Sequence, residues 1–342
     1  MRSLAVTLLA ATVAVALPSV RELREAIPAG EGRVVSIMHR YGRVDVAGGE
    51  TDSFRVDAVA RVDGTDRRHV DRFVQDIELS LAAWSETVFV SVLYPDLPEP
   101  SAELSYEVDL DLSVPRSAAL VAVNSFGDVK VVGLDGGCRV ENRFGNVGLD
   151  ACRDCDVTSR YGDVHATATT GLLKVNNSYG SVFLDEASEL VQVDNSYGNV
   201  KGTNLDGEVY MGNVFGNVIT RGGRGQLVIA NRFGDVDAWV EDTGLTELDV
   251  QAQLGQVHLN VARLVPFRIG GRTIEGIIRT GLPVRVCEEG SKRWISGQSG
   301  RGGPSIQFTG AWADFIIGPD SEVLFGSESV PGVRPDSAGD RR

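Results

Sequence analysis

The sequence predicts an all-β chain, a single-stranded β-solenoid or β-helix with coils of about 18 residues. Three observations lead to this fold: glycines recur at a nearly constant interval, Val follows each of them by two residues, and an aromatic residue precedes nearly all of them. The glycines of the repeat are Gly127, Gly145, Gly162, Gly180, Gly198, Gly216 and Gly234, with a further copy at Gly255. Their spacing of 18, 17, 18, 18, 18, 18 and 21 residues is too short for a helical repeat or a propeller blade.

Each repeat predicts two short strands that meet at the glycine. Before Gly180, for example, Leu173 and Val175 are apolar and the residues between and after them are polar. Alternation with period two is typical of a strand with one buried face. The glycine is then the corner of the coil, where a Cβ would be costly, and equivalent residues of successive coils are expected about 4.8 Å apart.

Asn stands three residues before most of the corner glycines, as Asn177 and Asn195 do. These side chains are either a row of ligands for a cation or a sugar, or a ladder of amides that bond one another or the turn backbone. Repetition favours the ladder, because a site is needed once but a corner on every coil. The residue after the glycine is often Asp, Asn or Ser, which predicts bonds to local turn backbone.

The aromatic residues before the glycines are expected to stack as one of the core columns. In the middle of the row, Tyr161, Tyr179 and Tyr197 need an outlet for their hydroxyl groups, so we expect this edge of the core to touch solvent. These three tyrosines are the candidate ligand-facing aromatics, and carbohydrate rings are the ligands that such a row could stack against.

Weaker copies of the repeat are expected at both ends. One has its corner at Gly42, one has Ala313 in the glycine position, and a degenerate one centres on Gly276. The predicted division is 32–115 for the first coil with a capping insertion of antiparallel strands, 116–262 for the regular coils, and 263–318 for degenerate C-terminal coils. Within the insertion, the segment TDRRHVDRFVQ predicts a short helix capped by Thr65 or Asp66. Residues 326–342 are expected to form a disordered tail.

The N-terminus predicts export. Residues 1–16 hold an Arg, an uncharged apolar run and a small-x-small site at Ala14–Ala16, as in a cleaved signal peptide; the alternative is an N-terminal membrane anchor. The mature chain is expected not to span a membrane. With 33 basic and 47 acidic residues, its net charge of −14 argues against nucleic acid as a partner.

Two segments resemble a known family. The run from Leu104 to Gly136, in which Val114–Pro115 ends an extended strand and Asn-x-x-Gly-Asp-Val follows, resembles the entry segment of the bacterial putative-adhesin family of β-strand-repeat domains of unknown function. Gly300 to Gly310 resembles that family's last coil. The resemblance implies an exported, solenoid-like, non-enzymatic protein of the cell envelope, located in the periplasm or on the cell surface.

The cysteines predict a disulfide. Cys138 and Cys155 both stand seven residues before a corner glycine, so they share an inward column on adjacent coils, at a separation that a disulfide accepts. An exported protein keeps such bonds. A Cys138–Cys152 bridge is the second choice, and buried free thiols are the alternative.

No catalytic or metal-binding motif emerges from the sequence. The four His, at 39, 69, 165 and 258, form no ligand pair of known spacing, and no nucleophile elbow occurs. We therefore expect no enzyme activity, no cofactor and no metal. The sequence favours an adhesin or structural scaffold that presents rows of side chains to an envelope protein or a glycan. Two alternatives remain: a carbohydrate-binding or carbohydrate-cleaving β-helix, and a filament that self-associates end to end.

Overall fold

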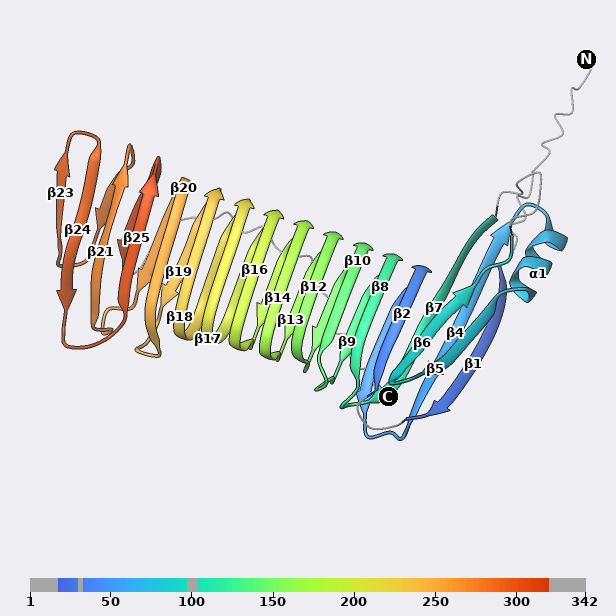
Figure 1. The fold of residues 1–342 in the computed structure, drawn as a ribbon. Helices are drawn as coiled ribbons and strands as arrows, with labels where there is room; N and C mark the ends of the chain where they lie inside the picture. Colours follow the sequence, from blue (N-terminus) through green and yellow to red (C-terminus); the bar gives the residue numbers. More distant parts are fainter. Residues whose placement is uncertain (1–17, 30–32, 97–103, 320–342) are drawn as a thin grey trace, which may run out of the picture.

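The computed structural model describes residues 18–29, 33–96 and 104–319. Apart from one short helix, this part of the chain is all-β, as the sequence predicts, and its strands join in one sheet of 26 strands. Figure 1 shows most of them side by side in a long row, with the helix at the end nearer the N-terminus.

Each repeat forms one strand before its corner glycine and a shorter one after it. The strands before the glycine are β8 (Ala119–Phe126), β10 (Cys138–Phe144), β12 (Arg153–Tyr161), β14 (Thr170–Tyr179) and β16 (Ser188–Tyr197). The strands after it are β9 (Val129–Val132), β11 (Val147–Asp150), β13 (Val164–Thr167), β15 (Val182–Asp185) and β19 (Val236–Val240). Later in the chain, successive strands merge into β17 (Val200–Phe215), β18 (Val218–Phe233) and β20 (Leu245–Val261).

Strands of successive repeats pair in parallel, with equivalent residues side by side. Val140 of β10 pairs with Ala122 of β8 and with Val157 of β12. Beyond the corner, Val147 of β11 pairs with Val129 of β9 and Val164 of β13. Each repeat therefore makes one turn of the chain and lies against the turn before it. We call each such turn a coil.

The core lies between the strands before and after the corner. In the coil of Gly180, the side chains that alternate inward are Leu173, Val175 and Asn177 before the glycine, and Val182 and Leu184 after it. All five are at most 3% exposed. A burial pattern of period two on both sides of the corner confirms the strand pattern predicted from the sequence. Stacking of these columns gives one continuous apolar core along the row of coils.

The expectation that the aromatic residues form a core column is wrong. Tyr179 is 44% exposed, although Asn177, two residues earlier, points inward. The alternation ends at the corner, because the next inward side chain is Val182, three residues beyond Tyr179. The residue just before the glycine therefore lies on the outer side of the bend.

The first coil consists of β2 (Val34–Tyr41) and β3 (Val44–Gly49), with its corner at Gly42. Its strands pair in parallel with β8 and β9, in the register that the sequence predicts. On the other side, β6 (Thr87–Leu93) extends the layer of β2, and β7 (Leu104–Pro115) extends the layer of β3.

Antiparallel strands complete this end. β5 (Glu78–Trp84) pairs with β6, whereas β4 (Ser53–Gly64) and then β1 (Ser19–Pro28) follow β7. Helix α1 (Arg67–Gln75) lies at the end of this cap, with Asp66 as its N-cap as predicted. The helix turns Val70, Phe73 and Val74 toward the strands. Strand β1 could not be predicted from the sequence, because its charged residues hide the alternation.

The C-terminal coils are not stacked in chain order. β25 (Ser305–Ala311) and β26 (Ala313–Gly318) pair with β20, and only beyond them lie β21 (Phe267–Ile274) and β22 (Ile278–Thr280). A hairpin of β23 (Arg285–Glu289) and β24 (Lys292–Ser299) then adds to β21, as Figure 1 shows at the end of the row. Both predicted copies, at Ala313 and at Gly276, form coils. The coil of Ala313 comes later in the chain but lies next to β20, and the coil of Gly276 lies beyond it.

The predicted division of the chain at residues 32, 115, 262 and 318 stays a prediction. The predicted signal peptide over residues 1–16 and the predicted disordered tail over residues 326–342 lie outside the described residues.

Candidate functional site

The corner of each coil is built from backbone in close contact with the next coil. The seven predicted corner glycines, Gly127 to Gly234, all have φ between 122° and 140°. A Cβ on Gly180 would lie 2.0 Å from the carbonyl oxygen of Gly162. Positive φ and this close approach both require glycine. The corner is therefore a structural element that recurs on every coil.

The Asn side chains form the predicted ladder, and they make both predicted kinds of bond: to the backbone of the corners and to one another. Nδ2 of Asn142 donates to the carbonyl oxygens of Gly127 (3.1 Å) and Gly145 (3.0 Å), so one amide joins two successive corners. Farther along, Nδ2 of Asn195 donates to Oδ1 of Asn213 at 3.0 Å. These side chains are nearly fully buried. The amides thus stabilise the corners from inside the core.

A second ladder lies just after the corner. Oδ1 of Asp128 accepts a hydrogen bond from the N–H of Asn146 at 2.7 Å, and the same bond recurs from each coil to the next. The further acceptor–donor pairs are Asn146–Asp163, Asp163–Ser181, Ser181–Asn199, Asn199–Asn217, Asn217–Asp235 and Asp235–Gln256. The prediction of bonds to local backbone is wrong in this respect: each side chain bonds the backbone of the neighbouring coil.

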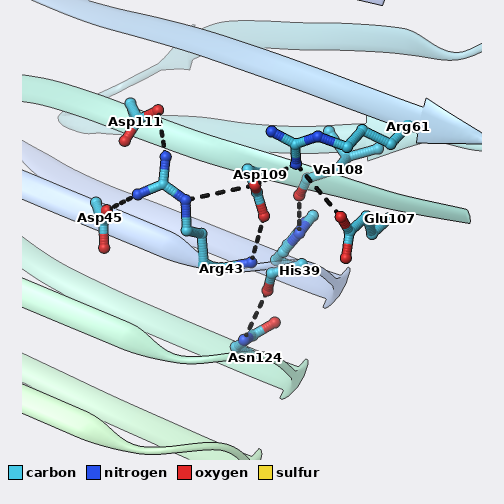
Figure 2. A network of polar contacts seen from close by, with 10 residues as sticks. His39, Arg43, Asp45, Arg61, Glu107, Val108, Asp109, Asp111 and Asn124 are labelled. Atoms are coloured by element: carbon cyan, nitrogen blue, oxygen red, sulfur yellow. Dashed lines mark hydrogen bonds and ion pairs between the residues drawn. The ribbon is translucent and has the colours of Figure 1, made fainter. Parts of the chain in front are cut away.

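The same ladder fastens the cap to the first coil. Oδ1 of Asp109 accepts from the N–H of Arg43 at 3.0 Å, while its Oδ2 accepts from Arg61 at 2.5 Å. Figure 2 shows this network, in which Arg43 also pairs with Asp45 and Asp111. Burial opposes ionisation of Asp109, but the hydrogen bonds from Arg61 and the Arg43 N–H outweigh it and hold the pKa of Asp109 below its ordinary value.

Outside the corners, the aromatic side chains form one stacked row. Ring centroids of neighbours lie 4.8 to 5.4 Å apart, and their planes are within 16° of parallel. The row consists of Tyr41, Phe126, Phe144, Tyr161, Tyr179, Tyr197, Phe215 and Phe233. Its predicted central tyrosines, Tyr161, Tyr179 and Tyr197, are 37%, 44% and 45% exposed. The structure brings these three together on the surface, and their contact with a ligand stays a prediction.

Arginines cover parts of this row. Arg143, Arg160 and Arg232 each place a guanidinium 5.3 to 5.6 Å from the ring that follows in the sequence, a cation–π contact. They stand two residues before a corner glycine, and between Arg160 and Arg232 the same position holds Ser178, Ser196 and Val214. Because these side chains are smaller than Arg, the outer face is recessed over these coils relative to the flanking ones.

A groove of about 990 Å³ follows this low stretch. It begins at Thr158 on β12 and reaches Arg272 and Ile274 on β21. Most of its lining residues are polar, among them Asn176, Ser178, Asp194, Ser196, Gln251, Gln253 and Thr309. Gly212 and Ala230 are among its smallest lining residues, with Ala252, Gly310 and Ala311. The sequence pattern did not reveal the groove, because it arises from small residues on several coils that lie side by side only in the fold.

Tyr210 lies within the groove, in an arrangement that depends on Gly212. A Cβ on Gly212 would lie 3.1 Å from Oη of Tyr210 and 2.9 Å from Oδ1 of Asp194. The Tyr210 ring thus extends along its own strand over a glycine, and Gly212 is buried beneath it. Burial and the nearby carboxylate of Asp194 raise the pKa of Tyr210. The sequence signal for this arrangement is a Tyr two residues before a Gly on an outward column.

The predicted cysteine pair also lies where the sequence places it. Cys138 and Cys155 are partners in the register of β10 and β12, and both are buried. Cys152 is buried nearby, with its Sγ 3.2 Å from the carbonyl oxygen of Asp150. The thiols are free in the structure, and the Cys138–Cys155 bridge stays a prediction.

Within residues 18–29, 33–96 and 104–319, no three His, Cys, Asp or Glu side chains are grouped so that they could hold a metal ion. Over the same ranges, no helix combines the length and the apolar character needed to cross a membrane.

Comparisons with known proteins give no family for this chain. No known protein family matches the sequence, and no curated protein matches it. Among solved structures, the chain is similar to a putative cell adhesion protein from Clostridium sporogenes ATCC 15579, with 8% identity, a TM-score of 0.25, and 88% of this chain and 99% of that one covered.

Two further structures show the same degree of similarity. A putative adhesin from Bacteroides fragilis NCTC 9343 has 10% identity and a TM-score of 0.28, over 89% of this chain and 99% of that one. A putative lipid binding protein from Parabacteroides distasonis ATCC 8503 has 8% identity and a TM-score of 0.29, over 88% and 96%. At these identities and scores, the likeness carries neither family membership nor an activity to this chain.

Proposed function

We propose that the chain is an exported β-solenoid that acts as an adhesin or structural scaffold in the bacterial cell envelope, without catalytic activity. The in-register parallel pairing of one coil on the next supports the solenoid class, because every coil repeats the same columns. The predicted signal peptide and the resemblance to the adhesin family support export to the periplasm or cell surface.

The observation that carries the proposal is the outer face of the strands before the corner glycines. There the coils place equivalent side chains in straight rows, and the exposed aromatic row borders the polar groove along the strands. Eight stacked rings at about 4.8 Å per coil extend over roughly 34 Å. Two ladders of hydrogen bonds hold the coils in register, so this face is rigid before any partner arrives, and little ordering entropy opposes binding.

Capture from an envelope extract tests the proposal. The purified chain is immobilised and compared with a variant in which Tyr161, Tyr179 and Tyr197 are replaced by Ser. A matched control carries Phe183→Ser, Lys201→Ser and Ile219→Ser, which lie on the strands after the corner. We expect the wild-type chain and the control to retain the same envelope protein or glycan, and the tyrosine variant to lose it. Equal capture by all three chains, with circular dichroism showing that each is folded, would exclude this face.

The same assay separates adhesion from cleavage. Captured or added polysaccharide is monitored for new reducing ends over time. Retention without release supports a binding surface, whereas release that depends on the intact chain would favour the alternative of a carbohydrate-cleaving β-helix.

The two ends of the row of coils disfavour self-association into a filament. One end is closed by α1 and antiparallel strands. The other ends in two short edge strands: β22, which has three residues and pairs with β26, and β23, which has five residues and carries Arg285, Glu288 and Glu289. A short charged edge resists pairing with a second copy. Light scattering that shows a concentration-independent monomer would exclude the filament, and growth with concentration would support it.

A further inference from the structure

We infer that the groove over β14, β16, β17, β18 and β20 is a binding site for a linear, uncharged polysaccharide that lies along the row of coils, with one sugar ring against Tyr210. This inference deepens the proposed function, because it names the ligand class of the same outer face.

The direction of the ligand follows from the shape of the groove. Its lining residues come from each successive coil between Thr158 and Arg272, and most of the outward ones occupy two neighbouring columns, with Tyr210 in the column next to them. Asn176, Asp194 and Gly212 belong to one column, while Ser178 and Ser196 belong to the other. A ligand that fills the groove therefore crosses the strands and meets a similar pair of positions about every 4.8 Å.

The chemistry of the lining matches hydroxyl groups. Asn, Gln, Ser and Thr side chains each offer both donors and acceptors, as sugar hydroxyls do. Charges are few: the charged lining residues are Asp194, Arg232 and Arg272, and Nε of Arg232 is already bonded to Oε1 of Gln253 at 2.8 Å. With a net charge of −14 on the chain, an anionic polymer would be repelled by the protein as a whole.

An extended peptide fits this site less well. Peptides commonly bind to sheets by adding a strand to a free edge. The strands that form the groove are paired on both sides, from β14 through β20 to β25, so their backbone groups are already bonded.

Tyr210 supplies the aromatic surface that sugar rings stack against. The side chain is 38% exposed, and it lies over Gly212 instead of standing out from the sheet. Asp194 beside it offers carboxylate oxygens that can accept hydrogen bonds from hydroxyls of the same sugar. This combination of a flat ring and an adjacent acceptor occurs at the middle of the groove.

The test measures binding of the full chain by isothermal titration calorimetry. The probes are a soluble mixed-linkage glucan, an N-acetylglucosamine hexamer and its dimer, and polygalacturonate as an anionic polymer. We expect the glucan or the hexamer to bind, the hexamer to bind more tightly than the dimer, and polygalacturonate not to bind. Binding should change little between 50 and 500 mM salt, values chosen to span roughly 14 to 4 Å of screening length.

Variants locate the site. Tyr210→Ala is expected to weaken binding about tenfold, whereas Tyr210→Phe, which keeps the ring, should stay within about twofold. Ser196→Trp should abolish binding by filling the groove, and Gly212→Ala should weaken it by displacing the Tyr210 ring. Lys201→Trp, on the strands after the corner, is the matched control and should bind as the wild type does.

Several results would overturn the inference. One is that neither neutral polymer binds with a Kd below about 1 mM. A second is that Ser196→Trp binds as tightly as the wild type does. A third is that polygalacturonate binds more tightly than the neutral polymers do. Capture of an envelope partner without binding of any glycan would leave the proposed function standing and remove the polysaccharide site. Glycan binding without capture of an envelope partner would support the polysaccharide site and contradict the proposed function.

Discussion

The Sγ atom of Cys138 lies 2.9 Å from the Sγ atom of Cys155, inside the core and on adjacent coils. Because the two residues are direct partners in a parallel ladder, they need no backbone rearrangement to form a disulfide. We predict that the chain forms this bridge in an oxidising compartment. Mass spectrometry of non-reduced peptides checks it, and free thiols at all four cysteines would contradict it.

The bridge is also expected to stabilise the stack. It closes a loop of about 17 residues, and loops of that size are worth about 3 kcal/mol in the free energy of unfolding. Urea unfolding with and without reductant measures the difference. Cys152→Ser is the matched control and should leave the bridge intact. In the reduced chain, the hydrogen bond between the Cys138 and Cys155 thiols and burial raise the pKa of Cys155, so we expect it to react slowly with alkylating reagents while folded.

Gly180→Ala is expected to destabilise the chain by about 3 kcal/mol or more. The substitution adds strain at φ +135° and places a Cβ 2.0 Å from the Gly162 carbonyl oxygen. Gly148→Ala is the control, because the nearest atom to its Cβ would be 3.8 Å away and its φ is not positive. Urea unfolding should show a change below about 1 kcal/mol for the control. If Gly180→Ala lowered the free energy of unfolding as little as Gly148→Ala does, the corner would not require glycine.

The Asn ladder predicts unequal costs for the same substitution. Asn142→Ala removes two hydrogen bonds that join successive corners, and we expect it to lower the free energy of unfolding by roughly 2 kcal/mol. Neither polar atom of Asn177 has a hydrogen-bond partner, so Asn177→Ala should cost less. Chemical denaturation of the two variants decides, and a larger cost at Asn177 would refute the ladder as the source of the stability.

His39 makes the junction with the cap sensitive to acid. Burial lowers the pKa of His39 below its ordinary 6.5, although the carbonyls of Val108 and Tyr41 and the carboxylate of Asp109 oppose this. Below about pH 6.5 the unfolded chain therefore binds a proton that the folded chain does not, and stability falls as the pH drops. The lowered pKa of Asp109 adds a further loss below about pH 3.8, its ordinary value.

His39→Asn tests this account. Nε2 of His39 lies 2.7 Å from the Val108 carbonyl oxygen. One coil later, Asn124 makes the equivalent bond, in which Nδ2 donates to the carbonyl oxygen of Gly42. An Asn at position 39 would make the same bond without titrating. We expect urea unfolding at pH 7.5 and pH 5 to show a smaller loss of stability for this variant than for the wild type. An equal loss would assign the pH dependence to other groups.

Much of the coil could be predicted from the sequence because each coil repeats the same requirements. The glycine corners, the inward valines, the Asn ladder and the Cys138–Cys155 register all follow from residues compared at a fixed interval. The outward direction of Tyr179 could not, because period-two alternation fails where the backbone bends at Gly180. The position of the ring is set by the corner and not by the strand.

The groove is a different case. Its floor depends on Ser178, Ser196, Gly212 and Ala230, which are unremarkable in any one coil. Only their lateral alignment, together with the arginines that flank them, makes a hollow. Tyr210 likewise gains its position from Gly212 beneath it and from Asp194 on the neighbouring strand.

The placement of β25 and β26 between β20 and β21 has a consequence for the order in which the molecule folds as it is made. A chain is synthesised from its N-terminus, and the earlier coils can add to the growing stack in that order. Residues 267–299 cannot take their final place when they emerge, because the surface they dock on is made of residues 305–318. The outermost layer must therefore wait until residues 305–318 have paired with β20, which makes closure of this end the last event of folding.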